Sequence, residues 1–497
     1  MSQQITWQPT LETIPPELKR KIALHAFGPS LILDENRWSH MTQLELLTRQ
    51  TRIKALSLVS TSWADVLEEF RWQHIVIAPW MTDSLLSLAR DVLPRIARHV
   101  EQISIVDFSW NSTRDEYDDF DMAKSPDGQE LVAEAEAFLD LSSAQVPEDY
   151  RDLRLSQARH ALAAHILEGC PHARSIVIEG VPEVPPHDPE DEWYPVKPAY
   201  SKPAYSDRFE LALQHLGPKI EHVRLAMDRD DFEREEFGLA PRKAARYIEL
   251  FPKAKSLLID GLDRSYTEQI YDTEDRPATE ALLDSLRSLT SLESLTLVMC
   301  DWLSGRILHA YTYPVLPTTL KHLALVESDI PYHHCSIPAS YSPQNIAALT
   351  LVDRSCIGIS CDILSFDSLR FLSIACQAGR PLFGRFDNSP LENIELCADG
   401  IFHHACVSSE EVIAFLAQHR QTLRSLVLHK AIFRVPRNAE KVAEWCAQNG
   451  VIFAIRPDPP VPDYGEDEEA DWYHEHIMCD RWNAQLSCGS DASDDST

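Results

Sequence analysis

A six-residue pattern of apolar and polar positions recurs along the chain. Apolar residues occupy its first, fourth and sixth places, as in Leu292-Glu293-Ser294-Leu295-Thr296-Leu297 and Leu320-Lys321-His322-Leu323-Ala324-Leu325. Alternation over the last three places is typical of a short strand with one buried face. Ten segments fit the pattern and are expected to be strands. They begin at Val100, Ala173, Ile220, Ala254, Leu292, Leu320, Ile346, Leu369, Leu391 and Leu423.

The spacing between these segments predicts what lies between the strands. It shortens from 73 residues at the start to 22 near the end and then rises to 32, so the wide gaps must hold helices or insertions. Apolar residues recur at helical spacing at 206–217, 240–251, 278–286, 408–416 and 438–448. In the segment that begins at Ser408, this residue and the following Glu410 and Glu411 can cap a helix N-terminus. Alternating helices and strands favour parallel pairing, and we expect an α/β solenoid of stacked units.

A doubly wound enzyme domain also alternates strands and helices, but it usually carries a glycine-rich phosphate loop. Glycine is scarce here, at 15 of 497 residues, and neither GxGxxG nor GxxxxGK[ST] occurs. GxSxG, HExxH and kinase signatures are also missing from the sequence, so we expect a non-catalytic protein.

Candidate metal ligands are few. His333-His334-Cys335 and His403-His404-x-Cys406 group ligand types, and Cys356 and Cys361 lie five apart. Zinc sites usually show closer paired spacing, and we therefore expect neither a metal nor another cofactor.

Charge and cysteine usage narrow the class of partner. The net charge of −31 disfavours nucleic acid and anionic membranes. Eleven cysteines are scattered singly, which is typical of a reducing compartment. The opening residues show no signal-peptide pattern, and no apolar stretch approaches the roughly 18–20 residues that span a bilayer. We therefore expect a soluble protein of the cytoplasm, the nucleus or both.

The amino-terminal region follows a different pattern. Residues 14–27 place proline at a helix start and then apolar residues at helical spacing, and residues 53–72 form a second apolar helical segment. So small a helical unit cannot bury all of this apolar surface by itself. The pattern therefore implies a partner.

These segments resemble a known family. Ile14-Pro15-x-Glu17-Leu18-x-x-x-Ile22 is similar to the opening of an F-box, and Leu56-Ser57-Leu58-Val59-Ser60-x-x-Trp63 is similar to its second half. The resemblance covers about residues 12–77, and the array at 95–456 loosely resembles leucine-rich repeats. Residues 28–50 lengthen the connection between the two halves. The Asn or Cys that usually follows each repeat strand is mostly replaced, so other groups must bond the backbone there.

The resemblance implies the substrate receptor of an SCF-type ubiquitin ligase. Its F-box binds a Skp-family adaptor, the adaptor binds a cullin, and the repeats hold a protein substrate. Such a receptor performs no chemistry but raises the effective concentration of a substrate lysine near the conjugating enzyme. The residues that match apolar motif positions, some as core and some as interface, are Ile14, Pro15, Leu18, Ile22, Leu56, Leu58, Val59, Trp63 and Val66. The alternative is a repeat scaffold whose F-box-like segment no longer binds an adaptor.

The substrate-binding face is assigned from strand geometry. Residues that flank the central apolar place of each strand point to the same side of the sheet. The candidates are Ser294, Thr296, His322, Ala324, Ala348, Thr350, Phe371, Ser373, Asn393, Glu395, Ser425 and Val427.

The expected organisation has three parts. An F-box-like helical module occupies residues 1–80, and a repeat array occupies 81–456 with insertions at 107–150 and 182–206. An acidic, largely disordered tail occupies 457–497. It contains twelve Asp or Glu residues and a single basic residue, Arg481. The tail also holds aromatic residues, which can form a short docking helix for the array or for a partner.

Overall fold

The fold is described from a computed structural model. It describes residues 14–27, 52–58, 61–77, 82–105, 126–140, 151–179, 204–226, 241–262, 276–298, 300, 316–326, 345–352, 366–376, 386, 388–398, 408–429, 433 and 436–456.

Twelve strands form one parallel sheet in sequence order, β1 to β12. The ten predicted strands are all present, as β2 to β11. The architecture is therefore that of an α/β solenoid. For most of the described residues, the chain divides between Ile220 and Glu221 into two compact units.

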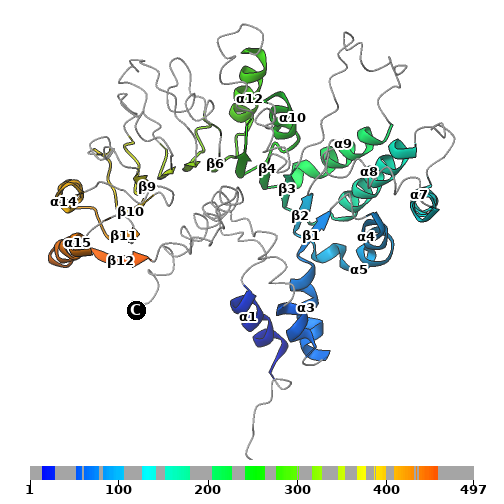
Figure 1. Ribbon diagram of the computed structural model, residues 1–497, viewed down its shortest axis with the longest axis horizontal. Coiled ribbons are helices and arrows are strands. Elements are labelled where there is room, and N and C mark those ends of the chain that lie inside the picture. The colour runs from blue at the N-terminus through cyan, green and yellow to red at the C-terminus, as the bar shows by residue number, and fades with distance from the viewer. Residues whose placement is uncertain are drawn as a thin grey trace, which may run out of the picture. The chain divides into compact units, whose positions relative to one another are not determined.

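The first unit combines the amino-terminal helices with three strands (Figure 1). Its strands are β1 (His74–Ile77), β2 (Gln102–Ile105) and β3 (Ser175–Glu179). Its longer helices are α1 (Pro16–Phe27), α3 (Thr61–Trp72), α7 (Pro126–Phe138), α8 (Arg151–Gly169) and α9 (Ala204–Leu216). Short helical turns complete it: α4 (Thr82–Ser87), η1 (Leu88–Val92), α5 (Leu93–Ile96), η2 (Ala97–His99) and η5 (Gly217–Lys219).

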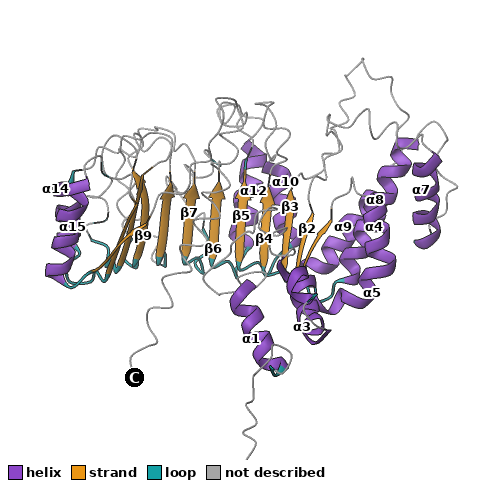
Figure 2. Cartoon of the chain, turned by 60° about the horizontal axis from the view of Figure 1, so that its bottom comes forward, coloured by secondary structure: helices purple, strands orange, loops and turns teal. Residues whose placement is uncertain are grey.

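The second unit is a row of nine strands, drawn side by side in Figure 2. They are β4 (His222–Ala226), β5 (Ser256–Asp260), β6 (Ser294–Val298), β7 (His322–Val326), β8 (Ala348–Val352), β9 (Phe371–Cys376), β10 (Asn393–Ala398), β11 (Ser425–His429) and β12 (Ile452–Arg456). Helices α10 (Pro241–Leu250), α12 (Arg276–Ser288), α14 (Ser409–Gln418) and α15 (Pro436–Asn449) lie on one side of these strands. The apolar places of the repeat, such as Leu295 and Leu297, form the buried core.

All five helices predicted in the array are confirmed, as α9, α10, α12, α14 and α15. The cap predicted for α14 is also present. The Glu411 amide donates to Ser408 Oγ at 3.1 Å, and the Ser408 amide donates to Glu411 Oε2 at 2.9 Å. This reciprocal pair satisfies two helix N-terminal amides.

Two strands were not predicted, at the two ends of the sheet. Strand β1 falls within the residues assigned to the helical module, where it follows α3 after one residue. Pairing of Ser425 with Ile452 puts Gly450 opposite Leu423. In β12, glycine therefore stands where the pattern has its first apolar residue. Gly450 has a φ of +71°, a conformation that glycine adopts without steric cost.

Side chains of several kinds bond backbone carbonyls of neighbouring units. Thr319 Oγ1 donates to the Leu292 carbonyl at 2.7 Å, and Thr422 Oγ1 donates to the Leu391 carbonyl at 2.8 Å. Cys300, which stands at the usual ladder position, lies with its Sγ 3.5 Å from the Ile259 carbonyl and is buried. Different groups thus tie successive units together.

The predicted insertion at 107–150 contains an unexpected element, helix α7, which packs against α8. The insertion at 182–206 is described only from residue 204, where α9 begins, and residues 28–50 and the tail at 457–497 lie outside the described residues.

Candidate functional site

The F-box-like segments form a small helical core of their own. Trp63, with 2% of its surface exposed, packs with Leu67 and Phe70 of α3 and with Ala23 of α1. Lys19 ties the two helices together, because its Nζ lies 5.6 Å from the centre of the Trp63 ring and donates to Ser62 Oγ. Arg20 on α1 adds an ion pair with Glu69 on α3.

Other residues of the same motif remain exposed. Leu18 and Ile22, one helical turn apart on α1, have 50% and 45% of their surfaces exposed. Leu58, just after the helical residues 52–57, is 79% exposed, and Pro15 is also exposed. Covering such apolar side chains with a partner is favourable, because it removes apolar surface from water.

The structure thus separates the nine predicted adaptor-binding residues into classes. Trp63 belongs to the core, and Ile14, Leu56 and Val66 are partly buried against it. Four are exposed, namely Pro15, Leu18, Ile22 and Leu58. Val59 lies outside the described residues. Leu24, an α1 residue that is 48% exposed, fits no position of the motif and was not predicted.

The predicted substrate-binding residues form two rows across one face of the second unit. Strand pairing aligns the first row in the order Ser294, His322, Ala348, Phe371, Asn393 and Ser425. It aligns the second row in the order Thr296, Ala324, Thr350, Ser373, Glu395 and Val427. The repeat pattern therefore brings together residues far apart in the sequence.

Accessibility varies along these rows. Thr350, Ser373 and Glu395 are buried, whereas Phe371 and Asn393 are partly accessible. Ser425 Oγ donates to Asn393 Oδ1 at 2.6 Å, and the Glu395 carboxylate lies 2.8 Å from His429 Nε2. Burial, together with the positive charge of neighbouring Lys321, lowers the pKa of His322, which favours its neutral form. The accessible predicted residues on this face are therefore uncharged at neutral pH.

Charged residues gather instead at the edge where the strands begin. The residue just before each strand alternates in charge over much of the second unit. Ion pairs join Lys255 to Glu221 at 3.2 Å, Lys321 to Glu293 at 2.9 Å, and both Arg370 and Arg424 to Glu392 at 3.1 and 3.4 Å. These pairs link neighbouring strands and help to fix their register.

The histidine and cysteine candidates for metal binding lie outside the described residues. Within the described ranges, no group of three or more His, Cys, Asp or Glu side chains is placed to hold a metal ion. The Cys446 thiol is buried. None of the described helices has the length and apolar character needed to cross a membrane.

Comparison with known proteins does not place the chain in a family. No protein-family model matches it, and a search of curated proteins found no relative.

Proposed function

We propose that the chain is the substrate-recognition subunit of an SCF-type ubiquitin ligase. Its amino-terminal helices dock a Skp-family adaptor, and through it a cullin, while the sheet face of the repeats binds a protein substrate. The protein acts without catalysis of its own, in the cytoplasm, the nucleus or both, by holding the substrate near the conjugating enzyme.

One observation carries the proposal, the exposure of Leu18, Ile22 and Leu58 in a motif whose tryptophan is buried. A helical pair that needed these side chains only for its own stability would bury them. Full burial of such a side chain in a partner contributes about 1.5–3 kcal/mol. A few buried residues dominate the affinity of a specific interface, and in the proposed docking these three side chains take that role.

The substrate half of the proposal rests on the accessible predicted residues of the sheet face, which are uncharged. Phe371 is an aromatic side chain in the middle of the first row, and Asn393 and Ser425 continue that row with groups able to form hydrogen bonds. Such a mixture suits a protein segment rather than a nucleic acid, whose phosphates require cations. Phe371 is therefore the expected anchor.

Affinity purification under proteasome inhibition tests both halves together. The wild-type chain is expected to recover a Skp-family adaptor, a cullin and ubiquitinated substrates. Leu58→Asp is expected to lose the adaptor and cullin but keep substrates, whereas Phe371→Ala is expected to lose substrates and keep the adaptor. Recovery of substrates without any adaptor by the wild-type chain would favour the non-ligase scaffold instead.

A further inference from the structure

A hollow in the first unit lies at the edge of the sheet where β2 and β3 begin. It has a volume of about 510 Å³ and is formed by the turns that precede β2 and β3 and by η5. The residues that line it are Arg98, Glu101, Pro171, His172, Ala173, Arg174 and Lys219. Its lining includes none of the motif residues and no residue of the second unit.

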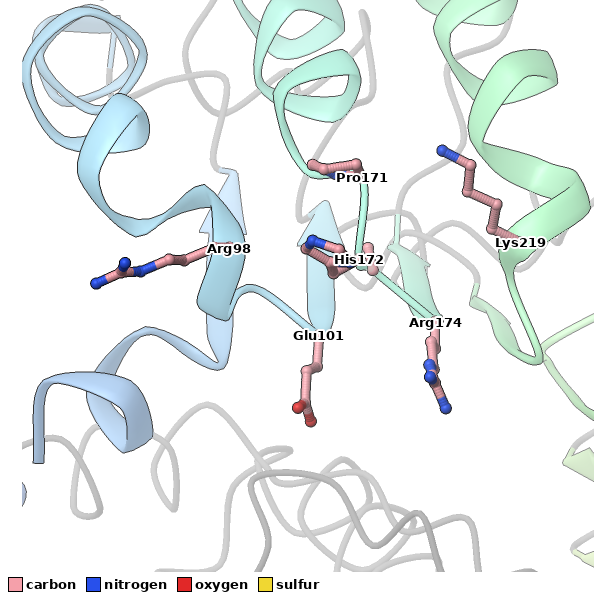
Figure 3. Close-up of a pocket in the computed structure, with 7 residues that line it drawn as sticks. Arg98, Glu101, Pro171, His172, Arg174 and Lys219 are labelled. Carbon is pink, nitrogen blue, oxygen red and sulfur yellow. The ribbon is translucent and has the colours of Figure 1, made fainter. Parts of the chain in front are cut away.

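Figure 3 shows how its side chains are arranged. Glu101 and Arg174 project in the same direction from the starts of neighbouring strands, and His172 lies above them. Lys219 extends from η5 on one side, and Arg98 extends away on the other. The cations surround the hollow but do not converge on one point.

The charges of this hollow are unusual for so acidic a chain. The lining holds three cationic side chains and the single carboxylate of Glu101, a local excess of two positive charges without counting His172. The edge cations of the second unit, such as Lys255 and Lys321, each have a glutamate partner. Within the described part of the chain, Lys219 has no ion pair.

Arg174 is held only loosely by its neighbour. It attracts the Glu101 carboxylate, but the described residues include no hydrogen bond between the two side chains. Burial raises the pKa of Glu101, so the carboxylate opposes an incoming anion less strongly as the pH falls. Arg174 and Lys219 are both exposed and available to a ligand.

The chemistry of the hollow determines the kind of ligand. Guanidinium and ammonium groups recognise phosphate oxygens through charge-assisted hydrogen bonds. A single small anion cannot reach cations that lie on different sides of the hollow, whereas a chain of phosphates can contact several of them. The volume is within the range of small-molecule sites.

We propose that this hollow binds a phosphate chain, free or esterified to a small organic molecule, through Arg174, Lys219 and His172. The site is independent of the proposed ligase function, since it uses neither the motif residues nor the sheet face. Its ligand would stabilise the first unit by binding only its folded form.

Isothermal titration calorimetry of the full chain, in metal-free and phosphate-free buffer, tests this site. The probes are tripolyphosphate as the free chain, ATP as the esterified chain and inorganic phosphate as the single group. Tripolyphosphate, ATP or both are expected to bind at least tenfold more tightly than inorganic phosphate. Binding of only one of the two identifies the source of the phosphate chain.

Two double variants with the same change in charge make the test specific. Arg174→Gln/Lys219→Gln is expected to weaken binding at least about tenfold, because it removes two charge-assisted contacts. Lys255→Gln/Lys321→Gln is expected to bind as the wild type does. Absence of binding by both phosphate chains, or equal binding by the two double variants, would overturn the proposal.

Discussion

Glu395 of β10 and His429 of β11 form a buried pair, with Oε1 and Nε2 2.8 Å apart, on the face of the sheet that carries the predicted substrate residues. They are not directly opposite one another. Pairing aligns Glu395 with Val427, so His429 lies two residues further along the neighbouring strand. The contact is therefore diagonal.

The same diagonal recurs in other pairs of strands. Arg224 of β4 bonds Asp260 of β5 at 2.8 Å, and His74 of β1 lies 2.7 Å from Ser104 of β2. In each case the partner lies two residues beyond the aligned position on the following strand. Side chains that lean along the strand direction explain this recurrence.

Removing one member of the Glu395–His429 pair is expected to be costly. His429→Leu takes away a partner of a buried carboxylate and should lower the free energy of unfolding by about 3–5 kcal/mol. Glu395→Leu/His429→Leu should recover most of that loss, because it leaves no buried charge. Urea denaturation of the two variants checks this, and an equal loss in both would mean that the pair itself is strongly stabilising.

The row of edge charges predicts a smaller effect. Glu392 pairs with two arginines, whereas Glu293 pairs with Lys321. Exposed ion pairs contribute about 0.2–1 kcal/mol each. Glu392→Gln should therefore destabilise the second unit more than Glu293→Gln, and the difference should shrink at 1 M salt. A difference that is unchanged by salt would point to packing instead of charge.

Packing in the first unit can be tested at Gly169. A Cβ built at this position lies 2.5 Å from Leu93 Cδ2, and Leu93 is buried. Gly169→Ala is expected to lower the free energy of unfolding by about 1–3 kcal/mol through overpacking. Gly169→Ala/Leu93→Val should regain part of it, as thermal denaturation can show. If the double variant regains no stability, the loss in Gly169→Ala would have to come from the backbone at residue 169 instead of from contact with Leu93.

Glu101 makes stability depend on pH. Its pKa is raised chiefly by burial, against the opposing attraction of Arg174. The folded state therefore holds the proton of the Glu101 carboxyl more tightly than the unfolded chain, in which glutamate has a pKa of about 4.3. The contribution to stability is complete below that value and is lost as the pH rises through the folded pKa. Compared with wild type, Glu101→Gln should show a smaller fall in stability between pH 4 and pH 7 in urea denaturation, and an identical fall in both proteins would contradict this assignment.

The repeat pattern predicted the strands well because each one repeats the same local signal. Strand β12 was not predicted because Gly450 replaces an apolar residue of the pattern. Strand β1 was not predicted because its four residues, directly after a helix, are too few to show the pattern. Helix α8 was also missed, since its many alanines blur the division between an apolar and a polar face.

The sequence could not separate core from surface in the amino-terminal motif. Trp63 and Leu58 are both apolar residues at matching motif positions, yet one is buried and the other is almost fully exposed. Burial depends on how α1 packs on α3, which no local pattern contains. The diagonal pairs were not predicted for a similar reason, because their members lie on different strands. Glu395 and His429, for example, are more than 30 residues apart in the sequence.

The affinity of the purified chain for a purified Skp-family adaptor tests the proposed docking without other proteins present. Leu58→Asp is compared with Leu211→Asp, a matched change at a leucine of α9 that is 49% exposed in the same unit but outside the motif. We predict that the wild type and Leu211→Asp bind equally, and that Leu58→Asp binds at least a hundredfold more weakly with an unchanged melting temperature. If the folded wild-type chain does not bind the adaptor, or if Leu58→Asp binds as the wild type does, adaptor docking through Leu58 is ruled out.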